Sequence, residues 1–416
     1  MPTEKENYGF GSNKTKKILN RVLAATLSKG MAFLAVCGFI LSSCTNEDDP
    51  VAPTDEVESQ LQKMTLREKV GQLFYVRPEC LDTTIHFNLP SGIDESADDI
   101  KAIKLQAVNA TMLGVNEKYP VGGIILYAHN IKDEVQLAAF IPQIRALKGS
   151  PLLCIDEEGG RVARIGNSED FDVETFVSMA AIGATGDPQN AYYCGNIIGT
   201  YLSLYDFDID FAPVADVNTN PENIVIGARA FSDDPEVAAT MVTSYLQGLK
   251  DAGISGCIKH FPGHGDTKSD THYGYAQSLK TWAEMLDCEM ITFKAGIAWG
   301  TQLIMTAHIA TPNVTGSDIP ATMSSVILQD KLRGELGYQN IIITDAMEMG
   351  AITRQYTNAE AAVGTLQAGA DIVLGPQNFV EAFDAVVKAV ENGTLSEQRI
   401  DQSVRRILRL KKQIGR

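Results

Sequence analysis

Eight short apolar runs recur along this chain of 416 residues, and each is rich in valine, isoleucine, leucine or phenylalanine. Apolar side chains are nearly continuous within each run, which is typical of strands buried on both faces of a parallel sheet. Longer stretches with helical spacing lie between the runs, such as 237–252 and 359–368. The eight runs are residues 71–76, 122–127, 152–155, 209–214, 256–260, 303–308, 341–345 and 371–374.

The order of these elements indicates the fold class. Strand and helix alternating eight times predict an α/β protein built as a single (β/α)₈ barrel of the TIM type. A doubly wound open sheet is the alternative with the same alternation. We expect the barrel to occupy residues 59–416, because no linker-like stretch interrupts that region.

Two segments precede the predicted barrel. Residues 1–43 contain a basic stretch followed by a short apolar core at 31–40, well below the ~20 residues that span a bilayer as a helix. The core ends in the sequence LSSC, which resembles a bacterial lipobox, so Cys44 is expected to carry a lipid. The alternative is an ordinary signal peptide followed by an incidental cysteine. Residues 44–58 are acidic and contain proline, which predicts a flexible tether.

The lipobox interpretation predicts an exported bacterial lipoprotein. The lipid anchor would attach it to a membrane, with the protein at the outer membrane, on the periplasmic side or at the cell surface. The chain has 52 acidic and 35 basic residues, a formal net charge of −17. Nucleic acids and anionic lipid headgroups bind cationic surfaces, so neither is expected as the main partner.

Polar residues follow several of the apolar runs directly. In a parallel barrel the carboxyl ends of the strands converge on one face, and active sites are found there. We therefore expect these side chains to share a pocket. They are Asp156, Asp216, Asn218, Lys259, His260, His308 and Asp345.

Residues 259–272 read KHFPGHGDTKSDTH and contain three of the six histidines. A metal site is one interpretation, but His260, His264 and His272 lack the helical spacing of known histidine ligand pairs. Proline and glycine also make this segment a loop rather than a rigid ligand face, so no metal is expected. The sequence contains no Walker loop and no G-x-G-x-x-G after a strand, and no other cofactor is expected. A carboxylate beside an imidazole suits proton transfer near neutral pH, as in the Asp270-x-His272 spacing.

Asp345 lies at the end of a predicted buried strand, in the sequence IIITDAMEMG. One interpretation is that it caps the following helix, which is a common role of aspartate. The other is that its carboxylate acts as a nucleophile. A carboxylate nucleophile together with an acid/base residue fits glycoside hydrolysis by double displacement.

Five blocks of the sequence, in order, resemble glycoside hydrolase family 3. The pattern K-H-F/I-P-G-H/D-G-x₄-D-x-H, found in the β-N-acetylglucosaminidase branch of that family, is matched throughout residues 259–272. The family's β-glucosidases take their acid/base residue from a C-terminal α/β sandwich domain, and we expect this chain to lack that domain. The blocks are 64–74, 156–164, 211–231, 259–265 and 320–352.

The resemblance implies a role for each matched residue. Asp345 would be the nucleophile, His272 the acid/base and Asp270 the group that orients His272. The expected sugar-binding residues are Asp156, Arg164, Arg229, Lys259 and His260. Arg164 and Arg229 could alternatively form structural ion pairs.

The implied activity is that of a retaining exo-β-N-acetylhexosaminidase, which releases terminal β-linked N-acetylglucosamine through a covalent glycosyl-enzyme. The alternatives are an N-acetylglucosaminide phosphorylase, a β-glucosidase and a non-catalytic glycan-binding lipoprotein. The expected partner is a carbohydrate with terminal N-acetylglucosamine. Two features depart from the branch: the expected export of this chain and the long insertion 78–118, which is expected to alter the leaving-group side of the pocket. Muropeptides, chitooligosaccharides and host glycans therefore all remain candidate natural substrates.

Overall fold

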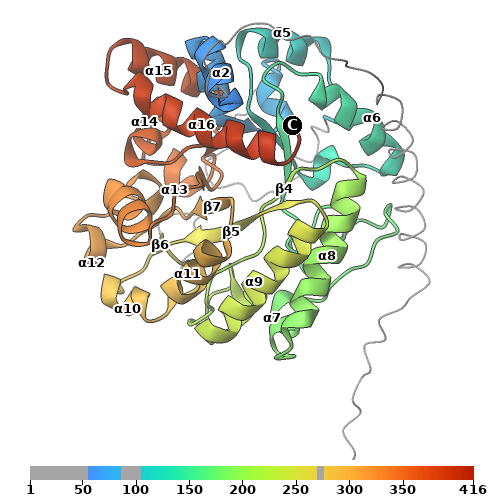
Figure 1. Ribbon diagram of the computed structural model, residues 1–416, viewed down its shortest axis with the longest axis vertical. Coiled ribbons are helices and arrows are strands. Elements are labelled where there is room, and N and C mark those ends of the chain that lie inside the picture. Colours follow the sequence, from blue (N-terminus) through green and yellow to red (C-terminus); the bar gives the residue numbers. More distant parts are fainter. Residues whose placement is uncertain (1–54, 86–104, 269–275) are drawn as a thin grey trace, which may run out of the picture.

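The computed structural model describes residues 55–85, 105–268 and 276–416 (Figure 1). Eight parallel strands form one sheet in the order β10–β1–β2–β3–β4–β5–β7–β9. Seven of the eight predicted runs contain their strand in full, and β5 extends slightly beyond its run. The strands are β1 Phe74–Val76, β2 Gly123–Leu126, β3 Leu152–Ile155, β4 Ile209–Asp210, β5 Ser255–Phe261, β7 Leu303–Thr306, β9 Ile341–Thr344 and β10 Val373–Leu374.

The two edge strands of this sheet, β9 and β10, also meet. Ile343 and Ile372 form a parallel bridge, and the N–H of Thr344 donates to the carbonyl of Ile372 at 3.0 Å. One step further, the N–H of Met347 donates to the carbonyl of Leu374 at 2.9 Å. These bonds close the sheet, so the predicted (β/α)₈ barrel is confirmed and the open doubly wound sheet is excluded.

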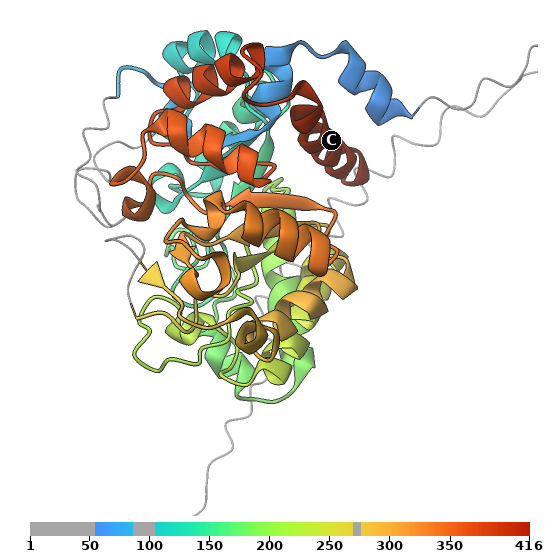
Figure 2. The same ribbon diagram turned by 90° about the vertical axis from the view of Figure 1, so that its left-hand side faces the viewer.

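Helices cover the outside of the barrel (Figures 1 and 2). The predicted helices 237–252 and 359–368 are confirmed as α9 and α14, and no end differs from the prediction by more than two residues. Asp234 caps the start of α9, and a capping box joins Thr357 to Glu360 at the start of α14. The longer helices are α5 Ala110–Lys118, α6 Glu134–Arg145, α8 Pro188–Leu204, α9 Pro235–Asp251, α11 Glu289–Trp299, α14 Asn358–Ala368, α15 Phe379–Glu391, α16 Glu397–Gln413 and a π-helix η5 Val326–Glu335.

Short elements lie in the connections. Among the parts of the chain that the structure describes, no helix is both long enough and apolar enough to cross a membrane. Two short strands, β6 Ala276–Gln277 and β8 Ile309–Ala310, pair in parallel beside the barrel. The other short elements are η1 Pro78–Leu81, η2 Ala128–Asn130, α7 Met179–Gly183, η3 Gly227–Arg229, α10 Trp282–Leu286, α12 Pro312–Thr315, η4 Ala321–Met323 and α13 Gly350–Thr353.

The amino-terminal part differs from the sequence-based prediction in two places. The run 71–76 begins inside helix α3 Leu66–Gln72, because a capping box of Thr65 and Glu68 starts a helix that continues to Gln72. Helix α2 Glu56–Lys63 reaches into the segment predicted as tether. It lies beside α16 (Figure 2), where Arg405 Nε donates to Glu58 Oε2 at 2.8 Å.

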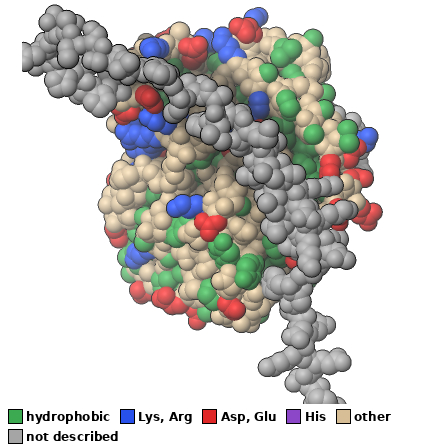
Figure 3. Space-filling view, turned by 45° about the vertical axis from the view of Figure 1, so that its right-hand side comes forward, with side chains coloured by type: hydrophobic (Ala, Val, Ile, Leu, Met, Phe, Trp, Pro, Cys, Tyr) green, Lys and Arg blue, Asp and Glu red, His purple; other side chains and the backbone are tan. Residues whose placement is uncertain are grey.

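Charge is spread over the surface. On the face seen in Figure 3, acidic side chains lie mainly along the lower and right-hand edges. Basic side chains occur in small groups among uncharged ones, mostly in the upper and left-hand parts of this face. No single continuous patch holds the acidic side chains that are visible on this face.

A buried carboxylate holds the amino end of β10 to the helices around it. Asp371 is fully buried and accepts from Arg333 Nη2 at 2.6 Å, Arg406 Nη1 at 2.9 Å and Ser403 Oγ at 2.6 Å. Burial alone would raise the pKa of Asp371, but Arg333, Arg406 and Arg399 outweigh burial and lower it. This cluster joins η5, α16 and the barrel at the face opposite the carboxyl ends of the strands.

Replacing Asp371 should therefore destabilise the whole barrel. We expect Asp371→Asn to lower the free energy of unfolding by about 3–5 kcal/mol, because buried guanidinium groups lose their counter-charge. Urea unfolding followed by circular dichroism measures this change. Asp384→Asn is the control: Asp384 pairs with Arg67 at 3.2 Å on the surface, and its loss should change stability by less than about 1 kcal/mol. Equal losses in the two variants would contradict the assigned role.

Candidate active site

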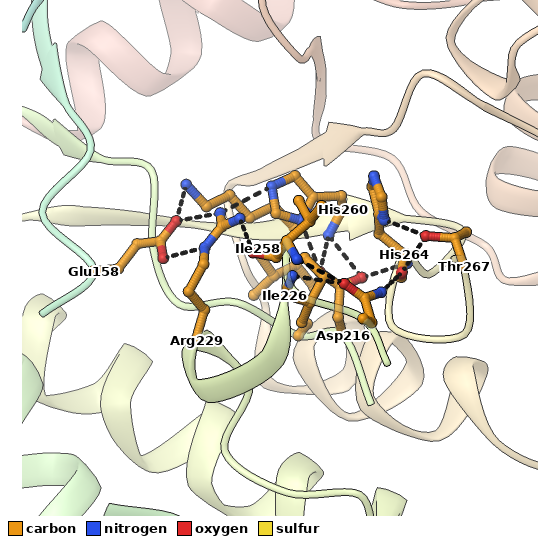
Figure 4. A network of polar contacts seen from close by, with 12 residues as sticks. Glu158, Asp216, Ile226, Arg229, Ile258, His260, His264 and Thr267 are labelled. Carbon is orange, nitrogen blue, oxygen red and sulfur yellow. Dashed lines mark hydrogen bonds and ion pairs between the residues drawn. The ribbon is translucent and has the colours of Figure 1, made fainter. Parts of the chain in front are cut away.

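The residues predicted to share a pocket lie on the carboxyl-end face of the barrel. Asp156 directly follows β3, Lys259 and His260 lie near the end of β5, and Asp345 directly follows β9. Arg229 ends the short helix η3 in the connection after β4. Figure 4 shows the polar network that joins several of these side chains.

Asp156 is the acceptor at the centre of one half of this network. Lys259 Nζ donates to Asp156 Oδ1 at 2.8 Å, and Arg164 Nη2 lies 3.5 Å from Asp156 Oδ2. The side chain of Asp156 is 16% exposed, whereas that of Lys259 is 3% exposed. A carboxylate that keeps open lone pairs beside two cations can accept hydroxyl groups while the cations donate to oxygens.

Glu158 is a site residue that the sequence analysis did not identify. It is buried, and it accepts from Arg229 through Nε at 2.8 Å and Nη2 at 2.7 Å (Figure 4). Lys259 Nζ lies 2.6 Å from the same carboxylate. Burial alone would raise the pKa of Glu158, but Arg229 and Lys259 outweigh it and hold the pKa far below its ordinary value. The ion pair considered for Arg229 therefore exists, and it is part of the site.

The neighbouring Glu157 faces the other way and holds the loop after β3. Its carboxylate accepts from the backbone N–H of Arg164 at 2.6 Å, of Ile165 at 3.0 Å and of Gly166 at 2.6 Å. The hydroxyl of Tyr201 donates to it at 2.8 Å. Because Glu157 binds the backbone N–H of Arg164, it fixes the backbone position from which the Arg164 side chain extends.

Asp216, which was predicted to share the pocket, anchors the end of β5. Its carboxylate lies 2.7 Å from His260 Nδ1 and accepts from the backbone N–H of His264 at 2.6 Å (Figure 4). Arg229 Nη2 lies 3.4 Å from His260 Nε2, and a guanidinium can only donate. His260 therefore accepts at Nε2 and carries its proton on Nδ1, which points to Asp216.

Asp345 does not cap a helix. The next helix, α13, begins at Gly350 with Met349 at its N-cap position, so the capping interpretation is wrong. The Asp345 carboxylate instead accepts from the N–H of Ala346 at 2.8 Å. His308 holds the same backbone, since its Nε2 lies 3.0 Å from the carbonyl oxygen of Ala346.

A further ion pair on this face was missed. Arg77, directly after β1, lies with its Nη2 2.8 Å from Glu348 Oε2, three residues beyond Asp345. Both groups come from connections at the carboxyl ends of strands, β1 and β9. The sequence around Arg77 could not predict Glu348 as its partner, because the two residues lie 271 positions apart.

Three predicted residues cannot be placed in this site. Asp270, His272 and Cys44 lie outside the described residues. The loop after β5 is described up to Lys268 and again from Ala276.

His264 gives the site region a specific pH dependence. Burial lowers the pKa of His264 from 6.5 to about 4, so the folded protein keeps this ring neutral over a range in which the unfolded chain binds a proton. Between pH 6.5 and 4 this difference lowers the free energy of unfolding as the pH falls, by about 1.4 kcal/mol per pH unit.

We therefore expect His264→Gln to flatten the decline of stability in this window. Urea unfolding of the wild type and the variant at pH 7.0, 5.5 and 4.5 measures the effect. The stability difference between the two proteins should shrink as the pH falls. Parallel curves would contradict a neutral, buried His264.

Comparison with known proteins gives a consistent picture. Residues 65–410 match the glycosyl hydrolase family 3 N terminal domain. The chain is 33% identical over 323 residues to the beta-hexosaminidase A of Pseudoalteromonas piscicida, covering 71% of this chain and 54% of that protein. It is 34% identical over 271 residues to a beta-hexosaminidase of Xanthomonas campestris pv. campestris, covering 64% of this chain and 81% of that protein.

A solved structure is similar over most of the fold. It is a glycoside hydrolase family 3 beta-N-acetylglucosaminidase from Paenibacillus sp. str. FPU-7, with a TM-score of 0.72 and 35% sequence identity. The match covers 85% of this chain and 63% of that one. The chain thus spans about half the length of the Pseudoalteromonas relative and under two thirds of the Paenibacillus structure.

Proposed function

The chain belongs to glycosyl hydrolase family 3, and we propose that it is a retaining exo-β-N-acetylhexosaminidase. In this proposal it releases terminal β-linked N-acetylglucosamine from glycans or peptidoglycan fragments. One observation carries the proposal: Asp345, which caps no helix, shares the carboxyl-end face of the barrel with the Asp156–Lys259 cluster. The relatives that bear the name beta-hexosaminidase support the choice of sugar.

The sugar is bound by the cluster after β3 and β5. Asp156 accepts hydrogen bonds from hydroxyl groups, and Arg164 and Lys259 donate to hydroxyl or acetamido oxygens. Arg229 and His260 complete this side of the pocket. Their orientation is supported by Glu158 and Asp216, which hold them at 2.7–2.8 Å.

The reaction has two steps. Asp345 attacks the anomeric carbon while the bond to the leaving-group oxygen breaks, and His272 gives that oxygen a proton. His272 then takes a proton from water, which attacks the same carbon and releases Asp345 with net retention. Asp270 orients His272 and stabilises its charged form. The Ala346 N–H and His308 support the orientation of Asp345.

Hydrolysis of two nitrophenyl glycosides tests the activity. The protein should release nitrophenol from 4-nitrophenyl N-acetyl-β-glucosaminide and not from the corresponding β-glucoside. The product should be free N-acetylglucosamine with or without added phosphate. A sugar phosphate would identify a phosphorylase, turnover of the glucoside a β-glucosidase, and binding without turnover a glycan-binding protein.

Asp345→Asn should remove the nucleophile while leaving the fold intact. We expect turnover to fall at least ~10³-fold, since no covalent glycosyl-enzyme can form without the carboxylate. A 5-fluoro N-acetylglucosaminyl fluoride should label the wild type at Asp345, as peptide mass spectrometry would detect. Asp330→Asn, at an exposed position, is the control with normal turnover. Labelling at another carboxylate would assign the nucleophile elsewhere.

We also propose that Cys44 anchors the protein to a membrane through a lipid, as an exported bacterial lipoprotein. The lipobox-like LSSC sequence supports this, and the acidic segment after it leads to helix α2 at Glu56. Cys44→Ser should abolish fatty-acid labelling and release the protein into the soluble fraction. Cys37→Ser, within the apolar core, should keep both labelling and membrane association. Persistent labelling of the Cys44 variant would contradict the anchor.

A further inference from the structure

The loop after β5 is built as two limbs on a common base. The outgoing limb, 262–268, leaves the end of β5, and the returning limb, 276–280, leads to α10. The proposed function assigns proton transfer to Asp270 and His272, which lie between these limbs in the sequence. The inference below rests on that assignment and concerns the described residues that support the two limbs.

Side chains of the connection after β4 hold the outgoing limb. Asn223 Nδ2 donates to the carbonyl of His264 at 2.8 Å, and Thr219 Oγ1 donates to Asp266 Oδ1 at 3.1 Å. Asn220 Nδ2 donates to the carbonyl of Thr267 at 3.1 Å. The outgoing limb is therefore fixed nearly to its last described residue.

A different element holds the returning limb. Strand β6 Ala276–Gln277 pairs with β8 Ile309–Ala310, and the N–H of Ser278 donates to the carbonyl of Ala310 at 3.0 Å. Strand β8 directly follows His308, which contacts the backbone beside Asp345. The returning limb is thus connected to the support of the proposed nucleophile.

Lys280 joins the two limbs through a buried carboxylate. Its Nζ donates to Glu289 Oε1 and lies 3.6 Å from Asp266 Oδ1 on the outgoing limb. Glu289, on α11, is 1% exposed, and a Cβ added to Gly263 would lie 2.4 Å from its Cγ. Glu289 therefore packs under the outgoing limb and pairs with the returning one. We name Asp266, Lys280 and Glu289 the loop-base cluster.

The charge on Lys280 suits this role. Burial disfavours the charged amine, but the hydrogen bond to Glu289 and the negative charges of Glu289 and Asp266 together outweigh burial and raise the pKa of Lys280. The ammonium group is therefore maintained across the neutral range, and it can bridge the two carboxylates there.

We propose that Lys280 is a positioning residue, which sets the Asp270–His272 pair by holding the two limbs of the loop together. Only seven residues, 269–275, separate the described limbs, so their separation constrains where the segment between them can lie. A misplacement of ~1 Å in an acid/base group can cost ~10²-fold in rate. The structure gives Lys280 no contact with Asp156, Lys259 or Asp345 among the interactions of the described residues. Loss of Lys280 should therefore affect proton transfer selectively.

The test is Lys280→Met in the full chain, assayed over substrates of increasing leaving-group basicity. On chitobiose, whose leaving group needs a proton, kcat/KM should fall ~10²-fold. On a dinitrophenyl N-acetyl-β-glucosaminide, kcat/KM should change less than ~5-fold, because that leaving group departs unaided. Slow release of the glycosyl-enzyme should then limit kcat. Azide attacks without a general base, so it should restore kcat and yield the β-glycosyl azide.

Matched variants separate positioning from general stability. His272→Ala supplies the reference pattern for complete loss of acid/base function, and Lys280→Arg should retain most activity on chitobiose. Asp266→Asn should resemble Lys280→Met in milder form. Lys69→Met is the control: Lys69 pairs with Glu397 at 3.0 Å and Asp401 at 2.8 Å, away from the loop, and its loss should leave the leaving-group dependence unchanged.

The outcomes are distinguishable. Equal losses of Lys280→Met on both substrates, without rescue by azide, would mean that Lys280 serves only the fold and would overturn the inference. A wild-type protein that hydrolyses neither substrate would overturn the proposed function itself, before any variant is compared. Selective loss on chitobiose with azide rescue supports the positioning role.

Discussion

The site depends on one buried carboxylate that is shared between two cations. Glu158 binds the guanidinium of Arg229 through two bonds and also contacts Lys259 at 2.6 Å. Removing charged groups from water is costly, and only short, well-directed contacts between them offset that cost. The Lys259 ammonium contacts buried Glu158 and also donates to the more exposed Asp156, at 2.8 Å. The positions of Lys259 and Arg229 beside Asp156 therefore depend on the buried negative charge of Glu158.

Function and stability are divided between the two ends of the barrel. The carboxyl ends of the strands carry partly exposed polar groups, such as Asp156 and Asp345. The amino ends carry ionic contacts, with Asp371 surrounded by arginines and α2 joined to α16 through Glu58. A barrel with this division can keep carboxylates open at one end, since its cohesion comes from the core and from the other end.

The groups proposed for sugar binding and for proton transfer have separate supports. The side chains proposed to bind the sugar are held by β3, β5 and buried carboxylates, whereas the described limbs of the loop after β5 are held by the β4 connection, β8 and α11. Two supports of this kind allow one group of contacts to change without the other. Glycine stands at position 263 because the backbone φ there is +121° and a Cβ would clash with Glu289, against which the loop passes.

Eight buried strands and the polar residues at their carboxyl ends could be predicted from local apolar patterning, because a nearly continuous apolar run is typical of a buried parallel strand. The sequence also carried the family motifs. Three features could be read only from the folded chain: which of the adjacent glutamates 157 and 158 enters the site, what Arg229 binds, and that Asp345 caps no helix. These features depend on contacts such as Arg229–Glu158 and Lys259–Asp156, between residues 71 and 103 positions apart. Patterning within a short window carries no information about such distant partners, since the folding of the whole barrel brings them together.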